Sequence, residues 1–400
     1  MENKKEENKK EEQNFLIEKY LKNPNLFNEI TETEFDKFIV GEIPTRKAIF
    51  LCSCGRLVEN SQIASYNLLI TSSAGAGKDY IVGNILRVIP KEEYIKRTRI
   101  SPTAFTYWHN SKNDKNWTWN GKVFYTEDIS EGVLNSDVFK VMCSSGSSTT
   151  IVIDQEAIDI HIEGKPVIIT TTANAVPSPE LTRRFEFCNL DECENQTEDI
   201  MKRHSEYAQI GIIPDYNLDY TKAMTLLKRV KVKIPFAKRI YKSFPRKNIM
   251  MRTKYPRFLD FIKSSCAFHQ YQRKTDEEGY LLAEEQDYEI ARIVLKKLTS
   301  NKYLIPLTIN QQKIIKFFEE CPTSELNCQE ALSYMNNIMA LNNFTNNLNL
   351  LVHYGLLESR LKEGDFHRQV NVYKLSETLT KHDIFDLPEF SKLEENIQPN

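Results

Sequence analysis

The chain has 400 residues, of which 40% are hydrophobic and 27% are charged, and its formal net charge is −2. This composition is typical of a globular protein with two or three domains, and it excludes a collagen-like or wholly disordered chain. No run of 18 apolar residues occurs, and the N-terminal sequence MENKKEENKKEEQ has no apolar signal region, so we expect a cytoplasmic protein without a membrane span.

Eight cysteines are scattered along the chain. In a protein of this length, that pattern is typical of reduced thiols and not of a disulfide framework. Cys52 and Cys54, together with Cys188 and Cys193, also suit a four-thiolate zinc site. Their C-x-C and C-x4-C spacings differ from those of common zinc ribbons and fingers, so reduced thiols remain the preferred interpretation.

The first 61 residues are predicted to form a tail followed by short helices. Residues 1–13 are a mixed Lys/Glu run without apolar anchors, which predicts a disordered tail. Residues 14–61 are predicted to be helical, because FLIEKYL has apolar residues at helical spacing. Thr31 and Glu34 have the spacing of a capping box, which predicts a helix start at Thr31.

Residues 62–197 alternate short apolar runs with helical patterns. The runs NLLITS, KVFYTE and PVIITTT are predicted strands, and DYIVGNILRVI and SDVFKVMC are predicted helices. Strands that alternate with helices indicate a parallel sheet covered on both faces, so the predicted fold class is α/β. The segment from Thr149 to Gly164 has two β-rich runs about a polar turn and is predicted to be a hairpin with an acidic tip, Asp154 to Glu156.

The C-terminal half is predicted to be mainly helical. Residues 198–300 have helical periodicity, most clearly in DYEIARIVLKKLTS. Residues 301–385 contain three predicted helices followed by two predicted strands about a polar turn, which is the pattern of a winged helix. Residues 386–400 are polar and acidic and are predicted to be a loose tail.

The stretch SSAGAGKDY, from Ser72 to Tyr80, nearly matches the phosphate-loop pattern G-x-x-x-x-G-K-[ST] and stands between a predicted strand and a predicted helix. Backbone N–H groups at such a turn bind phosphate oxygens, and a lysine adds a point charge. Ser72 replaces the first glycine, and Asp79 replaces the magnesium-binding hydroxyl. The alternative is a chance glycine-containing turn in which Asp79 caps the helix. The predicted nucleotide-binding residues are Ser73, Ala74, Gly75, Ala76, Gly77, Lys78 and Asp79.

Glu127 and Asp128 follow the predicted strand KVFYT, at the end where open α/β sheets bind their ligands. A phosphate loop works with a strand that ends in carboxylates, one for magnesium and one to activate water. The order Glu-Asp is the reverse of the usual order, so the two roles stay open, with Asp79 and Asp128 as predicted magnesium ligands. A helix cap is the alternative role of Asp128.

A third predicted strand, PVIITTTAN, ends in Thr172 and Asn174. An amide at Asn174 can hydrogen-bond both an attacking water and a terminal phosphate. The next segment, PSPELTRRFEF, contains Arg183 and Arg184, which suit neutralisation of transition-state charge within one subunit or across an interface. A basic surface pair is the alternative.

Fourteen Lys and Arg residues and one acid, Asp260, fall between Lys222 and Lys263. This excess of positive charge indicates a polyanionic partner such as DNA, and a solvated helical face is the alternative. Interleaved aromatic residues suit base stacking, although core packing explains most of them. The third helix of the predicted winged helix has an amide-rich face that suits a DNA groove or a protein partner.

The order of phosphate loop, acidic strand, hairpin, TTTAN, ELTRRF, basic helical segment and winged helix resembles that of an AAA+ ATPase. Over about residues 35–375, the chain resembles the replicative helicase-like ATPases of phages, plasmids and integrative elements, which are related to minichromosome-maintenance helicases. The most specific parts of this resemblance run from Thr170 to Phe185 and from Pro256 to Arg273.

The resemblance implies a P-loop AAA+ core over residues 62–197 and a basic helical lid over residues 198–300, with ATP and Mg²⁺ as ligands. It also implies hexameric rings around DNA, with any primase on a separate chain. The implied roles are Walker B acids for Glu127 and Asp128, sensor 1 for Asn174, the arginine finger for Arg183 or Arg184, and the second sensor for Arg257.

The sequence therefore predicts an ATP-dependent motor that moves on DNA in the replication of a mobile genetic element, as a helicase or a helicase loader. The hairpin from Thr149 to Gly164 is its candidate pore element. A second interpretation is a nucleotide-switched DNA-binding or scaffolding module in which Asp79 weakens hydrolysis. A third, a defence ATPase of a mobile element, shares the same residues.

Overall fold

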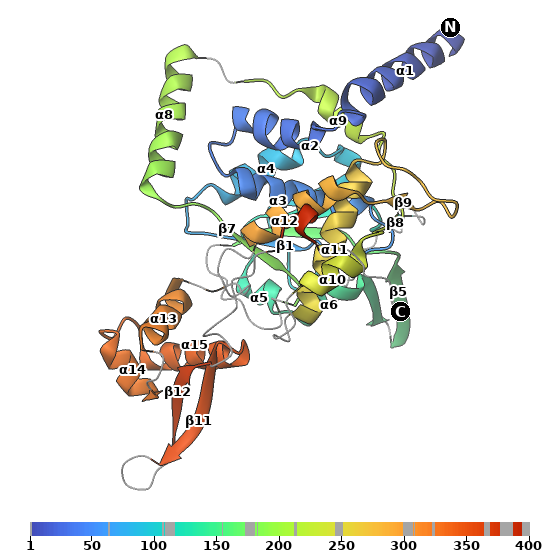
Figure 1. The fold of residues 1–400 in the computed structure, drawn as a ribbon. Helices are drawn as coiled ribbons and strands as arrows, with labels where there is room; N and C mark the ends of the chain where they lie inside the picture. The colour runs from blue at the N-terminus through green and yellow to red at the C-terminus, as the bar shows by residue number, and fades with distance from the viewer. Residues whose placement is uncertain are drawn as a thin grey trace, which may run out of the picture.

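The computed structural model describes residues 2–62, 65–105, 108, 117–153, 155–172, 181, 183–211, 214–244, 251–298, 307, 309–321, 325–363, 369–376 and 387–393. Buried apolar side chains in these ranges form three clusters. Two of them cover the faces of a central sheet, and the third belongs to a C-terminal group of helices and strands that lies beside the main body (Figure 1). None of the helices in these ranges is long and apolar enough to cross a membrane.

The central sheet has five strands in the order β2-β3-β6-β1-β7, and every neighbouring pair is parallel. Alternate residues of a strand face opposite sides. Leu68 and Ile70 belong to the larger apolar cluster, whereas Leu69 belongs to the second. Both faces are therefore covered, which confirms the predicted α/β fold. The strands are β1 (Leu68–Thr71), β2 (Tyr94–Arg97), β3 (Val123–Thr126), β6 (Val167–Thr172) and β7 (Glu186–Asn189).

Helices from distant parts of the chain cover the two faces. The second cluster contains α5 (Glu131–Leu134) and α6 (Asp137–Ser145). Because α11 and α12 share the larger cluster with the sheet, the last two helices of residues 198–300 belong to the main core. The helices of the larger cluster include α3 (Ile43–Cys54), α4 (Lys78–Leu86), α11 (Met251–Phe268) and α12 (Glu285–Leu298).

The N-terminal region is helical, as predicted, but its boundaries differ. Residues 2–13 form most of α1 and not a disordered tail, because oppositely charged residues recur at i,i+3, as in Glu6–Lys9 and Glu7–Lys10, and such pairs favour a helix. The helix start predicted at Thr31 is wrong, since Thr31 lies within a helical run and its hydroxyl donates to the Phe27 carbonyl at 2.8 Å. The elements are α1 (Glu2–Leu16), η1 (Ile17–Leu21), α2 (Leu26–Asn28), η2 (Glu29–Glu34), η3 (Phe35–Lys37) and, after α3, η4 (Gly55–Leu57).

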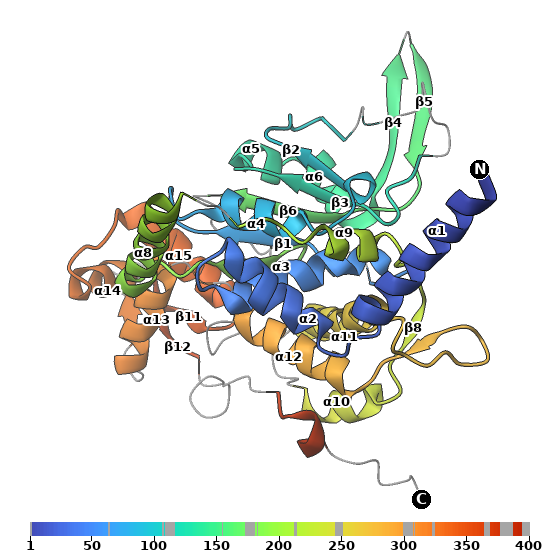
Figure 2. The same ribbon diagram turned by 90° about the horizontal axis from the view of Figure 1, so that it is seen from above.

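The predicted hairpin is confirmed. Strands β4 (Ser147–Ile153) and β5 (Glu156–Ile162) pair antiparallel along their full length. The hairpin projects away from the central sheet (Figure 2). Gln155 at its tip has a φ of 67°, in the left-handed region that two-residue turns use, and Asp154 lies outside the described residues.

The helical character predicted for residues 198–300 is also confirmed. Helix α8 has no buried residue, and it stands at the side of the molecule in both views (Figures 1 and 2). Two short strands, β8 (Val232–Lys233) and β9 (Leu281–Leu282), pair parallel beside the helices. Besides α11 and α12, the helices are α8 (Glu194–Ile210), α9 (Leu218–Met224) and α10 (Ala237–Ser243).

The C-terminal group contains the three helices and the strand pair expected there. A short strand, β10 (Leu326–Asn327), joins them to give the antiparallel order β10-β12-β11. Asn327 and Glu330 form a capping box at the start of the second helix. The other elements are α13 (Ile309–Glu320), α14 (Cys328–Tyr334), α15 (Leu341–His353), β11 (Leu357–Glu363) and β12 (Gln369–Leu375).

Part of the predicted loose tail is docked on the main body. Residues 387–393 contain the short helix η8 (Phe390–Lys392). The Phe390 ring lies 4.9 Å from that of Phe236, and the Tyr288 hydroxyl donates to the Pro388 carbonyl at 2.7 Å. These apolar and polar contacts order a segment that its acidic composition did not predict.

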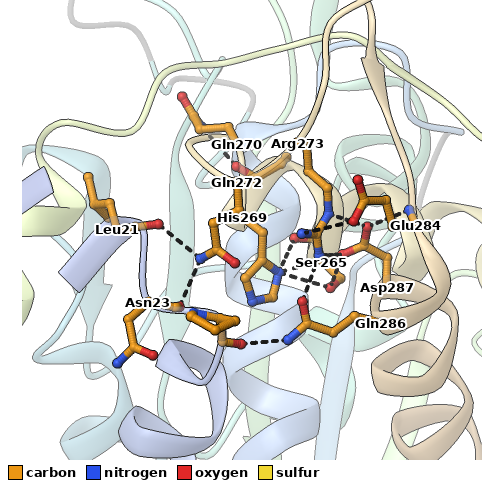
Figure 3. Close-up of polar contacts among 12 residues, drawn as sticks. Leu21, Asn23, Ser265, His269, Gln270, Gln272, Arg273, Glu284, Gln286 and Asp287 are labelled. Atoms are coloured by element: carbon orange, nitrogen blue, oxygen red, sulfur yellow. Dashed lines mark hydrogen bonds and ion pairs between the residues drawn. The ribbon is translucent and has the colours of Figure 1, made fainter. Parts of the chain in front are cut away.

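A buried polar network joins α11 and α12 to the N-terminal helices (Figure 3). Asp287 accepts hydrogen bonds from Arg273 Nε at 2.8 Å and from Ser265 Oγ at 2.7 Å, and His269 Nδ1 lies 3.5 Å from its carboxylate. Gln272 donates to the carbonyls of Leu21, at the end of η1, and of Asn23, which follows it. Burial raises the pKa of Asp287, but hydrogen bonds from Arg273 and His269 outweigh burial and lower that pKa to about 2.

This network predicts a pH-dependent contribution to stability. Because the pKa of Asp287 is lower in the folded state, its carboxylate stabilises the fold above about pH 4, and this contribution is lost as the pH falls toward about 2. We expect Asp287→Asn to lower the free energy of unfolding by about 2–3 kcal/mol at pH 7, with a smaller loss below about pH 4. Urea denaturation of both proteins across this range measures the difference.

The control for this experiment is Glu277→Gln, which changes an exposed carboxylate in the loop before β9. It should change the free energy of unfolding by less than about 0.5 kcal/mol at each pH. A difference between wild type and Asp287→Asn that stays constant with pH would contradict the role given to the charge.

Candidate functional site

The predicted phosphate loop connects β1 to α4, which is the strand–turn–helix context that such a loop requires. Gly75 and Gly77 have φ values of 87° and 83°, in the left-handed region that favours glycine. Nothing lies within 4 Å of a Cβ added at either glycine, so backbone conformation and not space selects them. Helix α4 begins at Lys78, and the first N–H groups of a helix have no intrahelical partner and suit an anion.

The Lys78 side chain lies along the start of the loop. Its Nζ donates to the carbonyls of Ser72 at 2.9 Å and Ser73 at 2.8 Å, and the residue is 7% exposed. The carboxylate of Glu192, a residue that no motif marks, accepts hydrogen bonds from the same two serines. An ammonium group and a carboxylate therefore both hold the first turn of the loop.

Asp79 joins the start of α4 to two strands and does not cap the helix. Its Oδ1 accepts hydrogen bonds from Tyr125 Oη at 2.9 Å and from Thr171 Oγ1 at 2.5 Å, and the N-cap position belongs to Gly77. Burial raises the pKa of Tyr125, and Asp79 raises it further, so the phenol keeps its proton and donates. The helix-cap alternative for Asp79 is therefore wrong.

Glu127 and Asp128 follow β3 as predicted, but their surroundings differ. Glu127 forms an ion pair with Lys96 Nζ at 2.5 Å. Asp128 is exposed with a φ of 38°, and its N–H donates to Thr171 Oγ1 at 2.8 Å. It does not cap the following helix, because the N-cap of α5 is Ser130. The fixed backbone and exposed carboxylate of Asp128 leave it available to a ligand.

The two predicted magnesium ligands lie close to each other, since the Thr171 hydroxyl contacts both Asp79 and the backbone of Asp128. Magnesium at phosphate sites usually takes one or two carboxylates, with substrate phosphates and water as its other ligands. Asp79 and Asp128 fit this donor set. The described part of the chain contains no group of three or more His, Cys, Asp or Glu residues that could hold a metal without such a substrate.

The zinc interpretation of the cysteines does not fit the structure. All eight cysteines are free, and Cys193 is exposed while Cys54 and Cys188 are buried. Within the ranges that the structure describes, no group of three or more His, Cys, Asp or Glu residues could hold a metal, so these cysteines do not gather into a zinc site. Burial raises the pKa of the Cys54 thiol to about 12 and that of Cys188 to about 11, as for protonated, reduced cysteines.

Strand β6 lies between β1 and β3 in the sheet, so its end at Thr172 lies between the phosphate loop and the acidic pair. A side chain just beyond this end would start from the edge that binds ligands in open α/β sheets. Asn174, the predicted sensor, falls in residues 173–180, which lie outside the described ranges. Its role therefore stays a prediction.

Arg183 and Arg184 precede β7, so they lie where the parallel strands begin. The phosphate loop lies at the opposite edge of the sheet, where the strands end. Arg184 Nε donates to the Lys140 carbonyl and to Ser144 Oγ, both at 3.1 Å, near the end of α6. The length of the strands separates both arginines from the phosphate loop of their own chain. Arg184 is hydrogen-bonded to α6, whereas the Arg183 side chain is exposed.

Arg257 does not line the cavity beside the phosphate loop. Its side chain is 2% exposed and pairs with Glu186 at 2.7 Å, and Lys254 pairs with the second oxygen of the same carboxylate. Burial raises the pKa of Glu186, but the two cations outweigh burial and hold that pKa below its usual range. Glu186 begins β7, so this buried triad lies at the far edge of the sheet. The structure thus corrects the predicted contact of Arg257 with a nucleotide in its own subunit.

A cavity of about 660 Å³ lies beside the phosphate loop. This volume is within the range of small-molecule sites. Part of its lining is the loop itself, from Ser73 to Gly77, and the rest comes from the N-terminal region, from α4, from α8 and from the connection that precedes α8. Outside the loop, the aliphatic and aromatic side chains of this lining are Phe38, Ile39, Val40, Tyr80, Ile81, Ile200 and Tyr207.

Hydrogen bonds to backbone carbonyls hold the N-terminal region at the cavity. Tyr80 Oη donates to the Phe38 carbonyl at 3.1 Å, and Gln196 Nε2 donates to the Val40 carbonyl at 2.7 Å. Sequence reasoning missed this half of the site. Contacts to carbonyls depend on where the backbone lies and not on residue type, so no motif marks them.

The basic stretch from Lys222 to Lys263 is partly neutralised within the protein. Arg246 and Lys247 lie outside the described residues, and Phe244 and Phe258 are buried, as core packing predicts. The electrostatic argument for a polyanionic partner is therefore weaker than the sequence indicates. Of the twelve cations that the structure describes here, at least five form ion pairs with carboxylates, namely Lys222, Lys233, Lys254, Arg257 and Lys263.

The contact between Tyr125 and Asp79 predicts a loss of stability. Tyr125→Phe removes the phenolic donor and keeps the ring, and we expect the free energy of unfolding to fall by about 1–3 kcal/mol, because hydrogen bonds to charged groups contribute on that order. Tyr94→Phe on β2 is the matched control, since the Tyr94 hydroxyl forms no hydrogen bond within the described ranges. Chemical denaturation measures both variants, and equal losses would contradict a specific role for the Asp79 contact.

Comparison with known proteins supports this description of the loop. A model of a P-loop domain family, the MTBMA_p00010 P-loop domain, matches residues 11–233, which is more than half of the chain. The match includes the five strands of the central sheet and the lining of the cavity. No curated protein matches the sequence. The chain belongs to the MTBMA_p00010 P-loop domain family.

Proposed function

We propose that this protein is an AAA+ ATPase that acts on DNA in the replication of a mobile genetic element, as a helicase or a helicase loader. The observation that carries the proposal is the phosphate loop, which borders a cavity of about 660 Å³ and shares its sheet with strand β3, directly before Glu127 and Asp128. This combination suits a nucleoside triphosphate together with the groups that hydrolyse it.

The parts of the nucleotide correspond to parts of the site. The apolar side chains around Ile39 and Ile200 suit a purine base, and the amides from Gly75 to Lys78 suit the phosphates. The ammonium of Lys78 would neutralise phosphate charge, and Mg²⁺ would bind Asp79 or Asp128. In this proposal, the exposed carboxylate of Asp128 is better placed than the paired Glu127 to orient the attacking water.

The sheet order supports the narrower AAA+ proposal. Strand β6 is inserted between the phosphate-loop strand and the acidic strand, as the predicted sensor position requires. Asn174 would then follow β6 toward the terminal phosphate. The structure gives a physical reason for that role, although the residue itself lies outside the described ranges.

The opposite edge of the sheet supports a site shared between copies of the chain. Arg183 is exposed there and far from its own phosphate loop. A neighbouring copy could receive this guanidinium at its nucleotide, which is the role of an arginine finger. We therefore propose a closed ring, with six subunits by resemblance to the helicase-like ATPases.

The C-terminal group supports a DNA contact. We propose that α13, α14, α15 and the sheet of β10, β11 and β12 are a winged helix, with α15 as the helix that enters a groove. Amide side chains can read base edges or contact phosphates. The exposed amides of α15 are Asn342, Asn343, Asn346 and Asn349.

A nucleotide-switched module without efficient turnover is the second proposal. The ion pair of Glu127 with Lys96 and the two hydrogen bonds to Asp79 favour it, because they occupy groups that a hydrolytic site uses. In this case nucleotide binding would control DNA binding or assembly, and the chain would not move on DNA.

Replacement of the loop lysine tests both proposals. We expect Lys78→Ala to weaken binding of ATP with Mg²⁺ at least about tenfold, since a cation in contact with phosphate contributes on the order of 1.4 kcal/mol or more. We also expect the wild type to hydrolyse ATP faster with single-stranded DNA, and Lys78→Ala to abolish that turnover. Calorimetry and phosphate release measure the two effects, with the exposed Lys91→Ala as control.

The outcomes of this experiment separate the proposals. Turnover that DNA stimulates supports the motor, and binding without turnover supports the switch. If the wild type binds neither adenine nor guanine triphosphates, both proposals fail.

The two arginines provide a test of the shared site. We expect Arg183→Ala to bind ATP normally but to lose turnover about 100-fold or more, as removal of transition-state charge stabilisation does. Arg184→Ala should instead lose about 1–2 kcal/mol of stability, through its contacts with α6, and keep its turnover.

Mixed assemblies check the assignment. Subunits with Arg183→Ala and subunits with Lys78→Ala should recover part of the turnover together, because one kind supplies a working phosphate loop and the other supplies the arginine. Full turnover by Arg183→Ala alone, or no recovery in the mixture, would count against a finger at this position.

A further inference from the structure

The connection between β7 and α8 places a carboxylate on the phosphate loop. Glu192 Oε1 accepts a hydrogen bond from the Ser73 N–H at 2.6 Å, and its Oε2 accepts one from Ser73 Oγ at 2.7 Å. The Ser72 hydroxyl donates to the same carboxylate. Three donors from two consecutive residues therefore hold one acid at the start of the loop.

Ser72 gives this contact a basis in the sequence. The usual phosphate loop has glycine at this position, and glycine has no hydroxyl to donate. Hydrogen bonds from Ser72 and from Ser73 lower the pKa of Glu192, and the charge of Lys78 lowers it further. The acid is therefore ionised at neutral pH.

The other two carboxylates of the cavity lining are engaged elsewhere. Glu42 accepts hydrogen bonds from the Asp191 N–H and from the Thr45 hydroxyl. The Asp191 carboxylate accepts one from the Cys193 N–H at 3.0 Å. Among the acids that line this cavity, Glu192 is thus the one that contacts the phosphate loop.

The negative charge of Glu192 opposes the binding of another anion at the phosphate loop. Glu192 lines the same cavity as the loop from Ser73 to Gly77, which is where the phosphates of a nucleotide would lie. Like charges a few ångströms apart repel, and salt screens the repulsion when the groups are exposed, as Glu192 is. The hydrogen bonds to Ser72 and Ser73 hold the carboxylate where this repulsion is felt.

We propose that Glu192 lowers the affinity of this site for a nucleoside triphosphate. Its carboxylate competes with the phosphates for the loop and must leave Ser72 and Ser73 when the nucleotide binds. This inference rests on the proposed function, because it concerns the same cavity. Helix α8, which follows Glu192, has no buried residue, so its movement would expose no core, although it would break the hydrogen bonds of Gln196, Arg203 and Tyr207 with carbonyls of the N-terminal region. Any partner that draws α8 away from the loop would raise the affinity for nucleotide.

The test compares nucleotide affinity in charge-removing variants of the full chain. We expect Glu192→Gln and Glu192→Ala to bind a non-hydrolysable ATP analogue with Mg²⁺ about tenfold more tightly at low salt, with a smaller gain at high salt. Ser72→Gly should also tighten binding, because it removes one of the donors that hold the acid. Calorimetry measures each Kd, and Glu194→Gln, an exposed acid in the first turn of α8, should leave it unchanged.

A double-mutant cycle separates this role from a general loss of structure. Ser72→Gly should add little to Glu192→Ala, since both changes remove the same contact. Additive gains would mean that Ser72 and Glu192 act independently, and they would overturn the proposed competitor.

The binding results also distinguish failure of this inference from failure of the proposed function. If the wild type binds and Glu192→Ala binds equally or more weakly, the inference fails while the proposed nucleotide site stands. If the wild type does not bind but Glu192→Ala does, competition by Glu192 is supported, whereas the motor and the switch both fail for the wild-type chain. If no variant binds any nucleotide, the proposed function itself fails, and the inference fails with it.

Discussion

Parallel pairing of β1 with β6 and β7 decides which residues meet at each edge of the central sheet. Because all five strands run the same way, one edge gathers the phosphate loop, Glu127 and Asp128. The other edge gathers Arg183 and the buried Glu186. The phosphate loop with its neighbouring carboxylates at one edge, and the exposed Arg183 with the buried ion pairs of Glu186 at the other, both follow from this constraint. In the ring that we propose, the second edge of one copy would complete the site of the next.

The two departures from the phosphate-loop pattern both have partners in the fold. Asp79 binds hydroxyl groups of β3 and β6, and Ser72 binds Glu192. Asp79 replaces a hydroxyl that would face magnesium, Ser72 adds a hydroxyl where glycine has no side chain, and both side chains contact the protein. A loop held in this way keeps the geometry for phosphate binding, while carboxylates near Lys78 reduce its net positive charge. Moderate affinity and dependence on conformation are the expected consequences.

Two buried ionic networks attach the helices of residues 251–298 to the rest of the core. Lys254 and Arg257 meet Glu186 at the sheet, and Arg273 meets Asp287 next to the N-terminal helices. Loss of one partner would leave an uncompensated buried charge, which costs more than the pair itself contributes. These networks explain why α11 and α12 pack into the main core, although the basic composition of residues 222–263 suggests an exposed surface.

The sequence by itself determined the features that depend on neighbouring residues. Apolar spacing and turn chemistry located β1, the phosphate loop, α4 and the hairpin of β4 and β5, and they placed Glu127 and Asp128 at a strand end. The tertiary structure decided the features that depend on which distant segments meet. It brought Phe38 to Val40 and α8 to the loop, buried Arg257 against Glu186, tied Arg184 to α6, and set Glu192 on Ser72 and Ser73. A charged residue can have the same neighbours in the sequence whether it forms an ion pair inside a core or contacts a ligand. Only the fold distinguishes these two roles.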